Sequence, residues 1–210
     1  MMRIDFLSDK PDRAGRYLVR LDNGSTMRLY RQTVEDFALF SGKELTEEEM
    51  KVLRSDAGKM SAKMRAVRIV SASSVSKDDL CQRLIRKGED PQQAQEAVQW
   101  MADLNLVDDR QTAEQIVSRC VARGYGIAKA KQMLYEKRIP KEFWQEVLED
   151  YPDQTEKILE FLRKRLRSGA EERDRKRAID ALVRQGHSYA QIRSAMRFLE
   201  LDESQEDYYG

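Results

Sequence analysis

Basic side chains gather in two neighbouring stretches late in the chain. The first stretch is Arg163, Lys164, Arg165 and Arg167, and the second is Arg173, Arg175, Lys176 and Arg177. Glu156 and Glu160 can pair only part of this charge at i+3 or i+4 on a helix. Clustered cations bind polyanions tightly, because neutralising several phosphates releases their counterions. The pattern therefore indicates contact with a nucleic acid or an acidic protein surface, with a solvated helix face as the alternative.

Two smaller basic groups lie beside glycine-containing turns. One group is Arg83, Arg86 and Lys87, and the other is Arg123, Lys129 and Lys131. Cations near a helix C-terminus also interact favourably with its dipole, so a purely structural role is the alternative here. Tyr125 lies within the second turn, and we expect its ring to pack across the junction between helices.

No set of residues in the sequence predicts catalysis, a cofactor or a metal. His187 is the single histidine, and no nucleophile or zinc set can be assembled around it. Asp108 and Asp109 precede a helical pattern, where acids usually cap a helix. Gly42-Lys43-Glu44 and Gly58-Lys59-Met60 lack the hydroxyl residue and the earlier glycine of a phosphate-binding loop. We therefore predict a protein that is not an enzyme.

Composition points to a soluble protein. Of the 210 residues, 36% are charged and 40% hydrophobic, and the net charge is +1, which conceals the basic stretches. No apolar run approaches the roughly 18 residues that cross a bilayer, so we expect a cytoplasmic location and no membrane partner. Cys81 and Cys120 are too few to form a disulfide framework.

The elements that must position these cations follow a threefold repeat. At spacings of about 50 and then 48 residues, Leu80, Leu84, Ile85 and Gly88 align with Ala130, Leu134, Tyr135 and Arg138, and then with Ala178, Leu182, Val183 and Gly186. In the second helix of each unit, Ala94, Val98 and Met101 align with Trp144, Leu148 and Tyr151, and then with Ile192, Met196 and Leu199. Both spacings place apolar residues on one helix face. We predict a mainly α protein in which tandem three-helix repeats form a curved, elongated array.

The N-terminal part predicts a small separate element. Residues 16–21 and 26–30 alternate apolar and polar side chains around Asp22-Asn23-Gly24, which predicts a β-hairpin. Thr33 is predicted to cap a short helix that reaches Phe40. Thr46 and Glu49 form a capping box for a helix that continues past Gly58, where a break is an alternative.

Five segments follow from these patterns. They are an N-terminal extension over 1–58, repeats over 59–107, 108–152 and 153–200, and an acidic tail over 201–210. Helices of the second repeat are expected near 109–122, 127–137 and 140–150, and those of the third near 154–167, 171–185 and 188–199. Capping residues are expected at Ser76, Asp90 and Ser188. Trp100 and Trp144 are expected to be packing anchors.

Three segments stand out within the repeats, namely Leu84-Ile85-Arg86-Lys87-Gly88, Leu106-Val107-Asp108-Asp109-Arg110 and Ala122-Arg123-Gly124-Tyr125-Gly126. These segments resemble the RecX family, whose members regulate the bacterial recombinase RecA. The resemblance covers roughly residues 60 to 200. Ile127 stands where the family commonly has proline, and the link between Arg167 and Arg177 is longer and more charged than expected.

The resemblance implies a protein that lodges in the groove of the RecA filament on single-stranded DNA. Such a protein restrains ATP hydrolysis and strand exchange and promotes filament disassembly, and so modulates homologous recombination, DNA repair and the SOS response. The implied partners are the RecA filament and single- or double-stranded DNA. A monomer is expected, because a repeat array with capped ends needs no partner to bury its core.

Two other functions are compatible with the residues alone. In one, a helix-turn-helix within a repeat presents its second helix to the DNA major groove, although these helices carry few cations. In the other, the array is a scaffold for protein interactions, which predicts no salt-dependent effect on DNA or on a filament.

Overall fold

The computed structural model describes the backbone of residues 1–166 and 171–209, and the side chains of those residues up to 199. It divides into two compact units, Met1–Val107 and Asp108–Gly210, which are described separately below. The predicted fold class is confirmed: the protein is mainly helical, with a small antiparallel sheet near its N-terminus.

The N-terminal sheet has four strands where the sequence predicted two. Strands β2 (Arg16–Leu21) and β3 (Thr26–Tyr30) form the predicted hairpin. Strands β1 (Met2–Leu7) and β4 (Glu44–Leu45) complete the order β3-β2-β1-β4. The two-residue β4 is too short to show a period of two in sequence, so its pairing with β1 depends on tertiary contacts.

The short helix after the hairpin differs from the prediction. Helix α1 (Arg31–Asp36) begins after Tyr30, and no side chain caps it. Thr33 lies inside the helix, where it is buried and donates from Oγ1 to Asp56 Oδ2 at 3.0 Å. The Thr33 hydroxyl therefore connects α1 to the next helix instead of capping its own.

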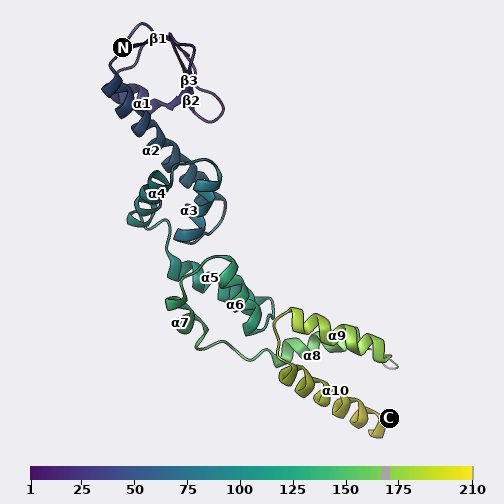
Figure 1. Cartoon of the computed structure of the whole chain (residues 1–210). Helices are drawn as coiled ribbons and strands as arrows, with labels where there is room; N and C mark the ends of the chain where they lie inside the picture. The colour runs from purple at the N-terminus through teal and green to yellow at the C-terminus, as the bar shows by residue number, and fades with distance from the viewer. Residues whose placement is uncertain (167–170, 210) are drawn as a thin grey trace. The chain divides into compact units, whose positions relative to one another are not determined.

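Helix α2 (Glu47–Ala72) is continuous and contributes to two cores. Its predicted capping box is present, with Glu49 N–H donating to Thr46 Oγ1 and Thr46 N–H to Glu49 Oε2. Met50 and Leu53 pack with the sheet, while Ala62 and Ala66 pack in the first repeat. Figure 1 shows the strands around the N-terminal half of α2 and the helices α3 (Lys77–Arg86) and α4 (Pro91–Asp103) along its C-terminal half.

Gly58 does not interrupt α2. A Cβ built at Gly58 would lie 2.2 Å from Gln93 Oε1, so the amide end of the Gln93 side chain on α4 occupies the space beside this glycine. The predicted division between residues 58 and 59 falls inside this helix. We therefore propose that α2 serves both the N-terminal extension and the first repeat.

The caps of the first repeat are as predicted. Ser76 Oγ accepts from Asp79 N–H at the start of α3, and Asp90 accepts from Gln92 N–H and Gln93 N–H at the start of α4, where Pro91 is the first residue. Trp100 packs against this core, and the ammonium of Lys63 lies 5.3 Å from its ring centre. It is the predicted packing anchor.

The second repeat consists of α5 (Asp109–Ala122), α6 (Ile127–Glu136), the 3-10 turn η1 (Lys141–Phe143) and α7 (Trp144–Leu148). Asp108 caps α5 by accepting from Gln111 N–H. Trp144 packs against the core and donates from Nε1 to Ile139 O at 3.0 Å. Burial raises the pKa of Tyr151 to about 12, and its hydroxyl donates to Tyr125 O at 2.7 Å.

The third repeat consists of α8 (Thr155–Arg165), α9 (Glu172–Arg184) and α10 (Tyr189–Tyr209). Ser188 Oγ accepts from Gln191 N–H, as the sequence predicted for a cap. Helix α10 continues through the segment expected to be a separate acidic tail. Residues 200–209 contain neither glycine nor proline, so no residue there stops the helix.

The threefold repeat predicted from the alignment is present in space. Leu80 and Leu84, Ala130 and Leu134, and Ala178 and Leu182 are all buried in their respective cores. The turn residues aligned after them, Gly88, Arg138 and Gly186, all have positive φ, at 89°, 55° and 90°. These positions therefore share burial and backbone conformation. Tyr135 is the exception, because its side chain is 72% exposed where the aligned Ile85 and Val183 are partly buried against their cores.

Candidate functional site

The first basic stretch lies at the C-terminal end of α8. Ile158, Leu159, Leu162 and Leu166 are buried, and this leaves Arg163, Lys164 and Arg165 on the exposed face, as predicted. Lys164 pairs with Glu160 at 2.7 Å, which lowers the pKa of that carboxyl. The guanidinium of Arg165 lies 5.3 Å from the centre of the Phe161 ring. Arg167 lies outside the described residues.

The second basic stretch lies at the N-terminal end of α9. Arg173, Arg175, Lys176 and Arg177 are all exposed, and Arg177 Nη1 lies 3.5 Å from Asp174 Oδ1. Only residues 166–171 connect α8 to α9, so the two stretches lie at the same end of the third repeat. We call Arg163, Lys164, Arg165, Arg173, Arg175, Lys176 and Arg177 the α8–α9 basic end.

The helix dipole stabilises cations at the C-terminal end of α8 and destabilises them at the N-terminal end of α9. Cations in the last turn of α8 are favoured by its partial negative charge, so helix stability accounts for part of their presence. The N-terminus of α9 carries partial positive charge, which disfavours Arg173 in the first turn. Glu172 and Asp174 in the same turn offset part of that cost. Lys176 and Arg177 lie one turn further on, where the dipole effect has fallen off, so helix stability alone fails to account only for Arg173.

The cations of the second repeat are dispersed around its turn. Arg123 ends α5 and is exposed, Lys131 is exposed on α6, and half-buried Lys129 donates from Nζ to Gln132 Oε1 at 3.0 Å. Tyr125 is half-buried and packs against the core of the repeat, as predicted. The structure does not join these cations into one cluster with the α8–α9 basic end.

The turn that follows α5 packs directly on the turn between α9 and α10. Gly124 has φ 69°, the left-handed conformation expected at a helix end. Gly126 N–H donates to Gln185 O at 2.9 Å, and a Cβ at Gly126 would lie 2.0 Å from Gly186 O. His187 is buried in this contact, with Nε2 3.0 Å from Gly124 O. The hallmark glycines of this turn therefore join repeats two and three.

In the first repeat, the structure adds three cations to those found from sequence. Arg86 donates to Gln82 O of its own helix. Arg83 and Lys87 instead line a cavity of about 430 Å³ together with Arg16, Arg65 and Arg68. We call these five residues the α2–α3 basic pocket. Its other lining residues are Tyr30, Ile69, Ala72 and Ser73, so none of the nine is acidic.

Three arginines of this pocket are held by acids that do not line it. Arg16 pairs with Asp12 at 2.9 Å, Arg65 with Glu89 at 2.8 Å and Arg83 with Asp79 at 2.8 Å. Asp79 and Glu89 are buried, so they give Arg83 and Arg65 fixed positions. Lys87 and Arg68 are exposed, and among the described residues neither forms an ion pair.

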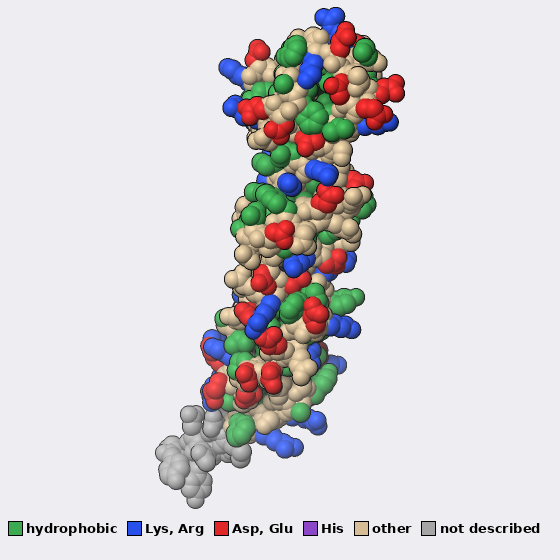
Figure 2. Space-filling view, turned by 90° about the vertical axis from the view of Figure 1, so that its left-hand side faces the viewer, with side chains coloured by type: hydrophobic (Ala, Val, Ile, Leu, Met, Phe, Trp, Pro, Cys, Tyr) green, Lys and Arg blue, Asp and Glu red, His purple; other side chains and the backbone are tan. Residues whose placement is uncertain are grey.

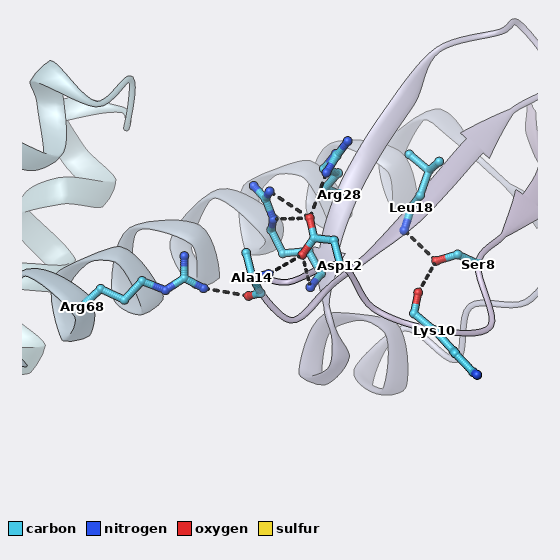
Figure 3. Close-up of polar contacts among 8 residues, drawn as sticks. Ser8, Lys10, Asp12, Ala14, Leu18, Arg28 and Arg68 are labelled. Atoms are coloured by element: carbon cyan, nitrogen blue, oxygen red, sulfur yellow. Dashed lines mark hydrogen bonds and ion pairs between the residues drawn. The ribbon is translucent and has the colours of Figure 1, made fainter.

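The loop between β1 and β2 forms one side of the same region. Asp12 accepts from the backbone N–H and the side chain of Arg16, from Arg28 Nη1 at 2.8 Å and from the N–H of Ala14, and these bonds lower the pKa of its carboxyl. Arg68 reaches from α2 and donates from Nη2 to Ala14 O at 2.7 Å (Figure 3). Nearer the end of β1, Ser8 stabilises the same loop by accepting from Leu18 N–H and donating to Lys10 O (Figure 3).

Sequence reasoning missed this pocket because its residues are far apart in the chain. A signal was present in α2, where Arg65 and Arg68 are three residues apart and hence on one helix face. Arg16 could be added only once the loop was known to contact α2. Charge elsewhere is mixed, since Figure 2 shows acidic and basic side chains interspersed over the face in view.

Neither a membrane span nor a metal centre is found in the described part of the chain. None of its helices combines the length and the apolar character that a bilayer crossing requires. No group of three or more His, Cys, Asp or Glu side chains is placed to hold a metal ion among those residues.

Comparisons with known proteins converge on one family, although no family profile matches the chain. The regulatory protein RecX of Streptococcus gordonii is 25% identical over 195 residues, covering 91% of this chain and 76% of its own length. The regulatory protein RecX of Chromohalobacter salexigens is 31% identical over 133 residues, covering 62% of this chain and 88% of its own length.

Two solved structures share the fold. A crystal structure of regulatory protein RecX aligns over 92% of this chain and 100% of its own, with a TM-score of 0.61 and 19% identity. RecX from Lactobacillus salivarius aligns over 69% of this chain and 97% of its own, with a TM-score of 0.57 and 21% identity. Together with the sequence relatives and the repeats described above, these similarities show that the chain belongs to the RecX family of regulatory proteins.

Proposed function

We propose that this protein is a non-enzymatic regulator that binds the RecA filament on DNA and mostly inhibits its ATPase and recombinase activities. The observation that carries the proposal is membership of a family whose relatives are named as regulatory proteins, at matches that span most of their length. Acting on RecA, it would modulate homologous recombination, DNA repair and the SOS response, as a monomer in the cytoplasm.

The α8–α9 basic end is the contact surface that we favour. Its cations are exposed, and Arg173 lies in the first turn of α9, where the helix dipole disfavours a positive charge. A charge that opposes the helix dipole is not explained by helix stability, so such a residue is a candidate for binding a partner. Exposed charges at such a surface chiefly accelerate association and make it sensitive to salt.

Inhibition follows if the protein binds one filament state more tightly than the other. A repeat array that bridges neighbouring recombinase subunits resists the rearrangement that accompanies hydrolysis. Only differential affinity for the two states can shift their populations, so no catalytic group is needed.

The direct test is the DNA-dependent ATPase rate of RecA at increasing amounts of this protein, at low and high salt. Binding to free DNA is measured in parallel. The proposal predicts a fall in rate at amounts well below those that coat the DNA. A fall that appears only when free DNA is saturated would contradict it.

A pair of variants tests the contact surface. Arg173→Glu with Lys176→Glu reverses two exposed cations of α9, and we expect half-inhibition to require about tenfold more protein, equivalent to about 1.4 kcal/mol. The matched control is Arg193→Glu with Arg197→Glu, which makes the same charge change on exposed positions of α10. We expect it to inhibit like the unaltered protein.

The same pair separates filament regulation from helix-turn-helix binding. Helix α10 is the second helix of the final helical pair, which would enter the major groove in that alternative. Loss of duplex affinity in the α10 control, with the α9 variant unaffected, would favour the helix-turn-helix function instead.

A further inference from the structure

The α2–α3 basic pocket carries more positive charge than its neighbours neutralise. Five cations line it, and three of them pair with Asp12, Glu89 and Asp79. Asp12 also binds Arg28, so its single charge is shared. Two positive charges, on Arg68 and Lys87, therefore face the cavity without an acidic partner among the described residues.

The four arginines of the pocket are held in place before any ligand arrives. Arg65 donates from Nη1 to Lys87 O at 2.5 Å and pairs through Nε with buried Glu89. Arg68 uses one Nη2 bond to Ala14 O, which leaves its other N–H groups available. Preorganised donors lower the entropy lost on binding. The arrangement thus holds unused guanidinium donors around an open cavity.

Size and charge match a phosphate-bearing ligand. A cavity of about 430 Å³ lies within the range that binds small ligands. Two uncompensated charges balance one terminal phosphate, which carries about −1.5 to −2, or two successive phosphodiesters. Arginine forks match phosphate oxygens, whereas one carboxylate would leave a positive charge unbalanced. Tyr30 and Ile69 offer an apolar wall against which a base or sugar can lie.

We propose that the α2–α3 basic pocket binds phosphate groups, those of a nucleic-acid strand or of a free nucleotide. Arg68 and Lys87 are the principal ligands, and Arg16, Arg65 and Arg83 complete the positive wall. The site lies in Met1–Val107, apart from the α8–α9 basic end. Its test needs no recombinase, so it stands or falls separately from the proposed function.

The test uses the double variant Arg68→Gln with Lys87→Gln in the full chain. Binding of a labelled oligothymidylate is followed by fluorescence anisotropy over a series of salt concentrations, and binding of tripolyphosphate by calorimetry. The variant loses its contacts with two phosphates of the strand. The slope of log K against log salt should therefore fall by about 1.4, at roughly 0.7 per phosphate. We expect the affinity for whichever probe the pocket binds, oligothymidylate or tripolyphosphate, to fall about tenfold.

The matched control is Lys51→Gln with Arg54→Gln, which removes the same charge from exposed positions nearer the start of α2. The single variant Lys87→Gln guards against misfolding, because the Lys87 side chain is exposed. A change in oligothymidylate binding assigns the pocket to a strand, and a change in tripolyphosphate binding alone assigns it to a free nucleotide. Unchanged binding of both probes, or an equal change in the control, overturns the proposal.

Discussion

At the scale of single residues, His187 is a buried titratable group held between two repeats. Its Nε2 carries the proton, because its partner among the described residues is the carbonyl of Gly124, which can only accept. Nδ1 is buried and has no hydrogen-bond partner among the described residues. Burial lowers the pKa of His187, and the contact with Gly124 opposes that shift in part. The neutral ring is thus the form that the fold accommodates.

This lowered pKa predicts an acid-sensitive contact between the second and third repeats. The contribution of His187 to stability is complete above its unfolded pKa of about 6.5 and is lost as pH falls toward the lower folded value. Thermal unfolding from about pH 7 to about pH 5 should therefore show a steeper fall in Tm for the unaltered protein than for His187→Gln. Parallel pH profiles of the two proteins would refute this.

Arg138 is a second residue with a measurable backbone cost. It occupies the turn position that Gly88 and Gly186 occupy in the other repeats, with φ 55°. Left-handed backbone costs a non-glycine residue roughly 1 kcal/mol. We expect Arg138→Gly to raise the free energy of unfolding by about 0.5–1 kcal/mol in urea titrations. A decrease would mean that the contacts of the Arg138 side chain outweigh the backbone cost.

At the scale of elements, the contact between two turns depends on the absence of a side chain. A Cβ at Gly126 would meet Gly186 O at 2.0 Å, Gly186 C at 2.3 Å and His187 N at 2.6 Å, all of them backbone atoms. Gly126 has φ −76°, which alanine also adopts. The cost of adding a methyl group there would therefore come from the contact alone.

Gly126→Ala should destabilise the protein by about 1–3 kcal/mol, the usual cost of overpacking. Gly58→Ala is the matched control, because its Cβ meets only the amide end of the Gln93 side chain, which can move. We expect Gly58→Ala to change the free energy of unfolding far less. Urea unfolding of both variants measures the difference, and equal losses would show that the turn contact is not rigid.

Helical elements were predictable from sequence because each has local signals. Thr46, Ser76, Asp90 and Asp108 each precede a periodic apolar pattern, and all four cap a helix in the structure. Strands β1 and β4 had no such signals, since they pair across some forty residues. At Thr33 a local signal was present but misleading. Threonine often caps helices, yet the Thr33 hydroxyl bonds to a tertiary partner, Asp56.

The candidate functional residues divide in the same way. The exposure of Arg163, Lys164 and Arg165 was predictable, because it follows from the buried stripe on their own helix. Arg16 and Arg68 were not predictable as neighbours, since the bond from Arg68 to Ala14 O joins residues 54 positions apart. Local periodicity reveals a helix face, whereas a pocket built from distant segments requires the fold.

At the scale of the whole molecule, each of the two units holds complete cores. The sheet and the first repeat bury their apolar residues within Met1–Val107, and the second and third repeats do so within Asp108–Gly210. A segment with its own core is expected to fold alone. The two units should therefore be separable by cutting the chain between Val107 and Asp108.

We predict that fragments 1–107 and 108–210 each unfold cooperatively, and that their circular dichroism spectra add up to that of the full chain. Phosphate binding should remain with the first fragment and inhibition of RecA with the second. A fragment that lacks a thermal transition would show that its core needs the other unit.

The turn contact between the second and third repeats also limits how the number of repeats can change. Gly126 and Gly186 must meet, so a copy inserted between these repeats would separate them unless it carried glycines at both positions. Gly88, by contrast, has no atom within 4 Å of a built Cβ. Duplication of a repeat at the junction between the second and third repeats thus requires two matched glycines to be inherited together. The second and third repeats therefore form a single heritable module.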